Sequence, residues 1–388
     1  MVRNAAIIGA GIGGLTAAHA LGQAGWQVRL FEQAPQLGEV GAGIQISPNA
    51  GQVLDKLGLL DALAAKASEP KNVRIIDGGD GSAILKMPLG NARQRWGQPY
   101  LLVHRADLLD VLAEGLEDIL ELGQAKDAGE LAQRFDLVVA CDGVKSQTRV
   151  KLFGDPQPRF SGHNAWRFLV PTSSLDLPKH LFDDSVVWAG KGCHAVTYAL
   201  RGGSLLNVVA ITEQSEELAE GWRQEGQREL LAKQFATMGP MFQQLVKAAP
   251  QPLYQWGLYT RLPLPRWHRN NVVLLGDAAH AMLPSQAQGA AQAIEDAWVL
   301  AKSLEGQGLG KGQDLSEGLK TYYRLRQPRT TRIAARSARN VGVFHQDQAL
   351  GRLRHYTPMR LASAVAPWAI QASFDWIYGH DVTRAKSA

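Results

Sequence analysis

The pattern of apolar and polar positions opens with a buried strand. Residues 5–8 are small or branched apolar side chains, which predict a strand of a parallel sheet. A glycine-rich turn follows, and the segment from Leu15 to about Gly22 predicts a helix. Residues 27–31 predict a second strand. This order of strand, helix and strand is typical of a nucleotide-binding α/β fold.

The same apolar strand pattern returns at residues 136–140 and 271–275, so we expect both segments in the first sheet. Between these segments, residues 73–76 and 84–87 alternate between polar and apolar, and residues 160–210 are rich in β-forming side chains. Both features predict an antiparallel sheet, with residues 201–203 as a hairpin turn. The strands expected there are 73–76, 84–87, 166–170, 185–188, 195–200 and 204–211, with 101–103 as one more short strand.

The fold predicted is therefore α/β: a Rossmann-like nucleotide domain interleaved with an antiparallel-sheet substrate domain, plus C-terminal helices. The nucleotide domain is expected at 1–72, 100–158 and 268–310, the substrate domain at 73–99 and 159–267, and the helical region at 311–388.

The connecting segments have patterns of their own. Residues 33–49 are rich in glycine and proline and predict a long loop, with Asn49 capping a helix at 50–57. Residues 117–134 are charged and helix-like. The other helices expected are 213–247 over one face of the inserted sheet, 290–304, 316–346 after a glycine-rich linker at 306–312, and 359–378.

The turn after the first strand contains Gly9-x-Gly11-x-x-Gly14, with Gly13 as a further glycine. Gly9 permits a tight turn, Gly11 lets a pyrophosphate approach the backbone, and Gly14 lets helix and strand pack closely. Glu32 ends the second strand, where an acid can hydrogen-bond a ribose diol. The spacing predicts a bound dinucleotide, and it leaves FAD and NAD both open.

Composition excludes several classes of protein. The 388 residues allow about two to three domains. The net charge of +5 is spread along the chain, so we expect no nucleic-acid partner. Two cysteines, Cys141 and Cys193, give no disulfide framework or cysteine-rich metal site. We expect no metal, no signal peptide and no membrane span, and hence a cytoplasmic protein.

Three motifs are found in order: Gly9-Ala-Gly11-Ile-Gly13-Gly14, Asp142-Gly143 within the segment 140–146, and Gly276-Asp277-Ala-Ala-His280. Together they resemble the single-component FAD-dependent aromatic hydroxylases, the salicylate-hydroxylase-like flavoprotein monooxygenases, over the chain to about residue 340. The resemblance implies FAD as the resident cofactor. No second Gly-x-Gly-x-x-Gly unit is present, so NADH or NADPH is implied as a transient reductant.

The resemblance also implies roles for single residues. Asp277 is expected on the ribityl chain of FAD, and Asp142 in both FAD and nicotinamide binding. Arg105 is expected near the flavin. Residues 284–290 are expected beside the isoalloxazine, where Gly289 and Ala290 open the next helix. The alternatives left open are a helix N-cap for Asp277, a surface cluster with Asp107 for Arg105, and a loop position without a chemical task for His280.

On the inserted sheet, His194 and Tyr198 are four residues apart, so both side chains lie on one face of a strand. The resemblance implies His194 as the base for a substrate phenol and Tyr198 as its hydrogen-bond partner. A pair without a function on an exposed sheet face is the alternative. Gln45 occupies the position at which certain relatives have a histidine. The exact substrate of those relatives is therefore not implied for this chain.

The implied reaction uses NAD(P)H and O2 to hydroxylate a small aromatic substrate, expected to be a phenolic acid, through a flavin C4a-hydroperoxide. Two alternatives stay open. One is oxygenation or epoxidation of a polyketide, isoprenoid or quinone precursor, and the other is a flavin-binding sensor or scaffold that has lost catalysis. The basic helix 324–339 predicts a solvated face or a subunit contact, which leaves a homodimer open.

Overall fold

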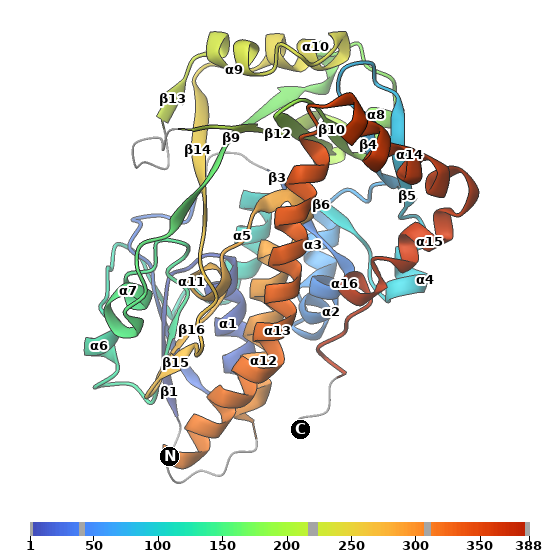
Figure 1. Cartoon of the computed structure of the whole chain (residues 1–388). Coiled ribbons are helices and arrows are strands. Elements are labelled where there is room, and N and C mark those ends of the chain that lie inside the picture. Colours follow the sequence, from blue (N-terminus) through green and yellow to red (C-terminus); the bar gives the residue numbers. More distant parts are fainter. Residues whose placement is uncertain (1–2, 39–42, 216–223, 306–311, 385–388) are drawn as a thin grey trace.

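The computed structural model describes residues 3–38, 43–215, 224–305 and 312–384 (Figure 1). Two large sheets organise them, one of six strands and one of eight. A smaller pair of strands, β3 (Gly43–Ile46) and β6 (Leu101–His104), belongs to neither large sheet. The mixed α/β fold predicted from the sequence is confirmed.

The six-stranded sheet has the order β15-β16-β8-β1-β2-β7. Its strands are parallel except for β15, and the four apolar runs of the sequence form its centre. One face packs against α1, α5 and α12, and the other packs against α6. The bounds are β1 Asn4–Ile8, β2 Gln27–Phe31, β7 Leu120–Glu121, β8 Leu137–Ala140, β15 His268–Arg269 and β16 Val272–Leu274; α1 Ile12–Gln23, α5 Arg105–Ala113, α6 Ala128–Leu131 and α12 Gly289–Leu304.

The eight-stranded sheet has the order β13-β14-β9-β12-β11-β10-β4-β5. Helices α8, α9 and α10 cover the face that points away from the first sheet (Figure 1). The bounds are β4 Asn72–Asp77, β5 Ala83–Pro88, β9 Arg159–Pro171, β10 Ser185–Ala189, β11 Cys193–Leu200, β12 Leu205–Glu213, β13 Gln224–Gly226 and β14 Leu253–Thr260; α8 His180–Asp183, α9 Arg228–Gln234 and α10 Pro240–Ala248.

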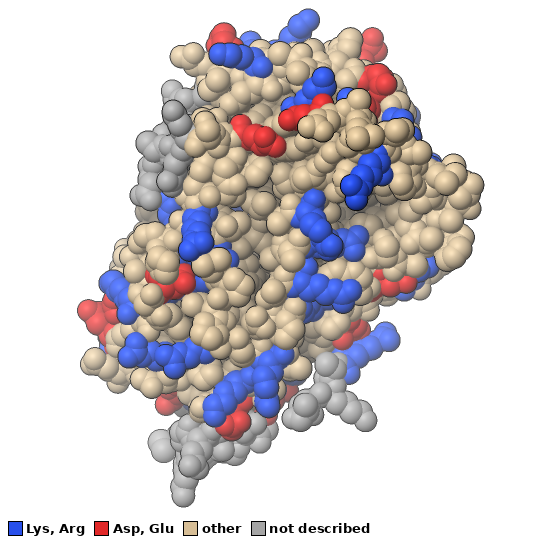
Figure 2. All heavy atoms as spheres, in the orientation of Figure 1, with Lys and Arg blue, Asp and Glu red and all other residues tan. Residues whose placement is uncertain are grey.

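The remaining helices surround these sheets, and α13 runs the length of the molecule beside both of them (Figure 1). Among the described helices, none combines the length and apolar character that crossing a membrane requires. Figure 2 shows Lys and Arg at separate places on this face, with acidic side chains among them. The bounds are α2 Pro48–Lys56, α3 Leu60–Lys66, α4 Ala92–Trp96, α7 Gln147–Phe153, α11 Asp277–His280, α13 Gly312–Phe344, α14 Ala349–Val365, α15 Pro367–Ala372 and α16 Asp375–Tyr378.

Three expectations about connecting segments were wrong. The loop predicted at 33–49 contains β3, because its residues 43–46 pair with β6; residues 39–42 lie outside the described residues. Asn49 lies inside α2, and Ser47 is the N-cap residue. The segment 117–134 is helical only at α6 and also supplies the edge strand β7, whose two residues pair with β2. The linker at 306–311 and residues 216–223 are likewise outside the described residues.

The basic helix is not a solvated face throughout, because two of its arginines enter a buried ionic cluster. Arg326 is 1% exposed, and its Nε and Nη1 lie 2.6 Å from Asp296 and 2.5 Å from Glu295. Arg329 donates to Glu295 at 2.8 Å. Burial alone raises the pKa of both carboxyls, but Arg326 and Arg329 hold the pKa of Glu295 below its usual range, and His280 with Arg326 does the same for the pKa of Asp296. The two carboxylates therefore stabilise the fold above the ordinary carboxyl pKa and lose that contribution as pH falls.

The cluster extends from α12 to three other segments. Asn49 of α2 donates to Glu295 Oε1 at 2.6 Å. Asp296 Oδ2 accepts from the backbone N–H of Gly276 at 3.1 Å and lies 2.5 Å from His280 Nε2. His280 was expected to have no chemical task, and this contact gives it a structural one: it holds the turn after β16 against α12.

Gly14→Ala tests the close packing of the first turn. A Cβ at Gly14 would lie 1.8 Å from the carbonyl oxygen of Gly9, so the strand and helix must separate. We expect a fall in the free energy of unfolding of about 3 kcal/mol in urea titrations. Gly22→Ala on the same helix is the control, because no described atom lies within 4 Å of its Cβ. That variant should gain about 0.5–1 kcal/mol; equal behaviour of the two variants would contradict the packing argument.

Arg326→Met tests the buried ionic cluster. The substitution leaves Asp296 without its guanidinium partner in the interior, and we expect a loss of about 3–5 kcal/mol. The matched control is Arg324→Met, since Arg324 is exposed on the same helix and hydrogen-bonds only Thr321 there. It should change stability by less than about 0.5 kcal/mol. Chemical denaturation of both variants measures the difference, and a small effect of Arg326→Met would show that the cluster is dispensable.

Candidate active site

The glycine turn has the geometry that its sequence predicts. Gly9 has φ +97°, and a Cβ there would lie 2.5 Å from the carbonyl oxygen of Cys141. A Cβ at Gly13 would lie 2.8 Å from Leu275, so this glycine serves the packing of α1 against β16. No atom of the described residues lies within 4 Å of a Cβ built at Gly11. Gly11, at the N-cap of α1, therefore faces open space where a phosphate group fits.

Glu32 follows β2 beside this turn. Its Oε2 accepts a hydrogen bond from the backbone N–H of Ala10 at 2.8 Å, and Oε1 accepts from Ala34 at 2.9 Å. The carboxylate thus holds the glycine turn in place, a role that the motif spacing did not reveal. Its hydrogen bond to a ribose stays a prediction.

Asp142 lies at the carboxyl end of β8, across the turn from Gly9. Its Oδ2 accepts from the N–H of Thr148 at 3.1 Å, whereas its Oδ1 is buried with no hydrogen-bond partner in the described part of the chain. Ser146 caps α7 by accepting from the N–H of Arg149. An unpartnered carboxylate oxygen of this kind marks a place for a ligand donor.

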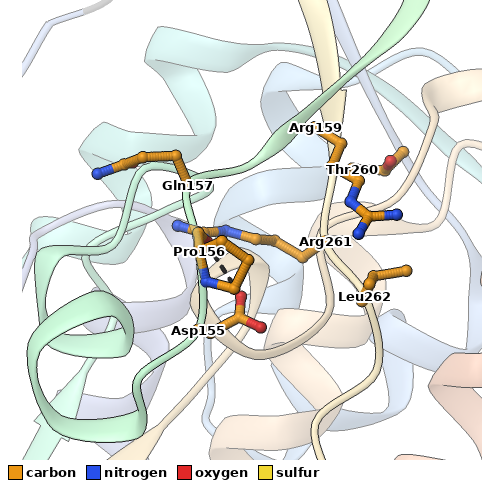
Figure 3. A pocket seen from close by; sticks show the side chains of 7 residues that line it. All are labelled: Asp155, Pro156, Gln157, Arg159, Thr260, Arg261 and Leu262. Carbon is orange, nitrogen blue, oxygen red and sulfur yellow. Dashed lines mark hydrogen bonds and ion pairs between the residues drawn. The ribbon is translucent and has the colours of Figure 1, made fainter.

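Arg149 connects this motif to the third motif, and the sequence reasoning missed it. The side chain is fully buried and donates to the carbonyl oxygens of Ala278 at 3.1 Å and Ala279 at 2.7 Å. Its Nε lies 2.8 Å from Asp155, and Arg261, the residue after β14, also contacts Asp155, at 3.2 Å. Figure 3 shows a small pocket here, with Arg261 pointing to Asp155; its lining is Asp155, Pro156, Gln157, Arg159, Thr260, Arg261 and Leu262.

Asp277 begins α11 directly after Gly276, whose φ is +64°. Asp277 is exposed to solvent, although the surrounding protein desolvates its carboxyl group. Desolvation raises the pKa of Asp277, and the nearby charges of His280 and Arg105 oppose that shift. Arg105, the first residue of α5, therefore lies close enough to Asp277 to interact with it electrostatically.

The segment 284–290 is held by hydrogen bonds to α13 and to Ser47. Ala287 has φ +51°, a left-handed conformation that is strained for a residue with a Cβ. Gln288 is fully buried and donates to the hydroxyl of Ser47 at 2.8 Å. Gly289 and Ala290 then open α12, and a Cβ at Gly289 would lie 4.0 Å from Asp277 Oδ1. Asp277 of the third motif and the start of α12 thus lie side by side.

His194 and Tyr198 share one face of β11, as the spacing predicts. A Cβ on Gly43 of β3 would lie 2.5 Å from the Tyr198 ring, so this face turns toward the nucleotide-binding side. Both side chains are buried, which removes the alternative of an exposed pair. Four residues of strand separate them by roughly 13 Å, however, so they do not meet.

Gln45 of β3 also reaches this face. Its Oε1 accepts from the hydroxyl of Tyr100 at 2.7 Å and of Ser185 at 3.4 Å. Ser185 lies on β10, the neighbour of β11. Gln45 therefore joins the nucleotide side to the inserted sheet by hydrogen bonds.

His194 is 0% exposed, and its Nδ1 lies 2.6 Å from Nε2 of His345, just beyond the end of α13. Burial, together with the imidazoles of His345 and His163, lowers the pKa of His194 well below its usual value. His345 in turn contacts Glu213 at 3.0 Å. His345 and Glu213 were missed because they are 132 residues apart in sequence and belong to no motif.

The residues at the ends of the strands, Gly11, Asp142 and Asp277, fit FAD. Gly11 leaves room at a helix N-terminus for the pyrophosphate, and Asp142 and Asp277 have carboxylate oxygens available for hydroxyl or amide donors. Arg105 adds a positive charge beside them. These groups come from three strand ends of one parallel sheet, the usual place for a nucleotide in such folds.

Comparison with known proteins agrees with this geometry. Residues 123–337 match the FAD binding domain family, and residues 7–56 match the NAD(P)-binding Rossmann-like domain. The 3-hydroxybenzoate 6-hydroxylase 1 of Aquipseudomonas alcaligenes is 34% identical, with 98% of each chain covered. The 6-hydroxynicotinate 3-monooxygenase of Pseudomonas fluorescens is 35% identical and covers 77% of this chain and 82% of its own.

Among solved structures, the salicylate hydroxylase substrate complex superposes with a TM-score of 0.81 at 25% identity, covering 98% of this chain and 96% of its own. HpxO of Klebsiella pneumoniae, complexed with FAD and uric acid, has a TM-score of 0.82 at 24% identity and 97% coverage of both chains, which shows the shared fold. FAD is accordingly the cofactor, with NADH or NADPH as the reductant. The chain belongs to the single-component FAD-dependent aromatic hydroxylases, the salicylate-hydroxylase-like flavoprotein monooxygenases.

Proposed function

We propose that this monooxygenase hydroxylates the ring of a phenolic acid, with His194 as the base that removes the phenolic proton. The proposal rests on one observation. The His194 imidazole is buried on the inserted sheet, and its Nε2 has no hydrogen-bond partner among the described residues. Relatives named as hydroxylases of 3-hydroxybenzoate support a hydroxylated aromatic acid as the substrate class.

In this proposal the three motifs hold FAD. Gly9, Gly11 and Gly14 shape the turn at the pyrophosphate, and the N-terminus of α1 supplies unpaired N–H donors. Glu32 takes the adenosine ribose. The remaining contacts are assigned to Arg105, Asp142 and Asp277, with Gly13, Gly289 and Ala290 giving close approach of the backbone. NAD(P)H visits this site transiently.

His194 suits proton abstraction because burial keeps it neutral. A neutral imidazole accepts a proton at its free nitrogen, and the phenolate that forms is a more electron-rich ring. FAD, when bound and reduced, supplies the activation of O2 and the transfer of its oxygen. The protein contributes the buried surroundings of His194, which keep water from the reacting ring.

Tyr198 has a different task from the one its spacing suggests. Its Cα lies roughly 13 Å from that of His194, which favours a contact with another part of the substrate than the phenolic oxygen. Its ring packs against the backbone of Gly43, and Asn207 on the adjacent strand accepts the N–H of Gly43 at 2.7 Å. We propose that Tyr198 fixes β3 at the edge of the flavin site. It also lines the part of the substrate site that lies farthest from His194.

The proposal also covers location and assembly. Both cysteines are free thiols, Cys193 being buried, as is usual for proteins of the reducing cytoplasm. We place the protein there and propose a homodimer as its assembly, which light scattering of the purified holoenzyme tests.

Asp277→Asn tests the assignment of the third motif. An amide replaces a carboxylate oxygen that accepts from the cofactor, and charge-assisted hydrogen bonds of this kind contribute about 1.5–3 kcal/mol. We expect FAD to bind about 10- to 100-fold more weakly in titrations of the apoprotein followed by flavin fluorescence. Asp118→Asn, at an exposed position far from the motifs in sequence, is the control. Unchanged affinity of Asp277→Asn would remove the residue from the site.

His194→Gln tests the base. With 3-hydroxybenzoate and salicylate as substrates, we expect kcat for product formation to fall about 100-fold or more. FAD content and the flavin spectrum should stay unchanged, because none of the three cofactor motifs contains His194. His355→Gln, at an exposed position of α14, serves as the control. Chromatographic identification of the product is the readout, and full turnover in His194→Gln would exclude the imidazole as the base.

A further inference from the structure

A chain of hydrogen-bonding groups leads from the face of the inserted sheet to solvent. It begins at His194 on β11, which is 0% exposed, and passes to His345, whose Nε2 lies 2.6 Å from His194 Nδ1. It ends at Glu213, the last residue of β12, whose Oε1 lies 3.0 Å from His345 Nδ1. The Glu213 side chain is 57% exposed, so this end is open to water.

The far end of the chain determines where each proton sits. A carboxylate only accepts hydrogen bonds, so His345 Nδ1 must carry the proton that it donates to Glu213. A neutral His345 then accepts at Nε2, and His194 must donate from Nδ1. A neutral His194 with its proton on Nδ1 has a lone pair on Nε2. That nitrogen is buried and has no hydrogen-bond partner in the described ranges of the chain.

Other charged or titratable groups face this chain from neighbouring elements. His163 on β9 lies opposite Glu213, with its ring centroid 5.6 Å from that of His345, and its Nδ1 is 2.9 Å from the carbonyl of Ser161. Asp347 and Glu213 both approach Gly192. Burial lowers the pKa of His345, while Glu213 and Asp347 act to raise it. The acidic groups therefore lie at the solvent end and favour the passage of a proton outward.

We propose that Glu213 and His345 are positioning residues that fix the tautomer of His194 and conduct its proton to solvent. This inference rests on the proposed role of His194 in phenol deprotonation. The phenolic O–H bond breaks as His194 Nε2 takes the proton, and His194 Nδ1 passes its own proton to His345 Nε2. His345 Nδ1 then passes a proton to Glu213, which releases it to water. The reverse passage reprotonates the product oxygen at release and restores both tautomers.

The tautomer is tested without any substrate. In the FAD-loaded protein labelled with 15N-histidine, we expect the His194 resonances to show a protonated Nδ1 and an unprotonated Nε2. His194→Gln assigns these signals. Glu213→Gln should give a mixture of tautomers, because an amide both donates and accepts. Asp347→Asn removes an equal charge nearby but leaves the His345–Glu213 bond, and it should keep the single tautomer. A protonated Nε2 in the unmodified protein would overturn the proposal.

The conduction step is tested by stopped-flow absorbance of phenolate formation when 3-hydroxybenzoate binds. We expect Glu213→Gln to slow this step about 10-fold, with Asp347→Asn unchanged. In His345→Gln the amide oxygen accepts from His194 Nδ1 but passes no proton on, so the tautomer should remain while the step slows about 100-fold. Equal rates in all variants would overturn the conduction role.

Two further outcomes are separated by the same experiments. If no phenolic acid is turned over while the tautomer pattern is as expected, the proposed function fails and the positioning role stands. His163, Glu213 and His345 offer ligand atoms within 4.8 Å of one another, a group that could hold a metal ion. EDTA should therefore leave the rate unchanged. Loss of activity with EDTA and its return with Zn2+ would show a metal at these residues and overturn the proposal.

Discussion

Two adjacent carboxylates on α12, Glu295 and Asp296, constrain the arrangement on which the flavin site depends. Neither side chain is exposed, and each would be very unfavourable in the interior without a cation. Arg326 satisfies both, which fixes α13 against α12. Their remaining oxygens accept from Asn49 and from the N–H of Gly276. The segments at the proposed FAD site are thus held together by ion pairs and hydrogen bonds within the protein itself.

The parts of the fold that repeat a local rule were predictable from sequence. The strands at 5–8, 137–140 and 272–274 are apolar because both faces of a parallel sheet are covered there, and the glycine turn has a fixed spacing. The even spacing of His194 and Tyr198 also placed both side chains on one face of the inserted sheet, because strand periodicity does not depend on distant residues.

The ion pairs were not predictable, because an arginine is read by default as solvent-exposed. Arg326 and Arg324 look alike in sequence, two positions apart on one helix, and only the fold separates them: one is 1% exposed and the other lies at the surface. The partners of Arg326 are 30 and 31 residues away in the chain. His345 and Arg149 escaped prediction for the same reason, since their partners belong to other elements.

The same principle applies at the ionic cluster of α12 and at the His194–His345–Glu213 chain. In the buried ionic cluster, Arg326 keeps the two carboxylates of α12 ionised. Asp296 therefore accepts a hydrogen bond from the N–H of Gly276, which fixes the turn there. At the inserted sheet, the exposed carboxylate of Glu213 makes His345 a donor at one nitrogen, and in the proposed relay this leaves His194 Nε2 free to accept a proton. In each case an ionised group outside the reacting centre sets the donor and acceptor pattern of the group nearer to it. A change at Arg326 or Glu213 would therefore alter the chemistry of residues that remain unchanged.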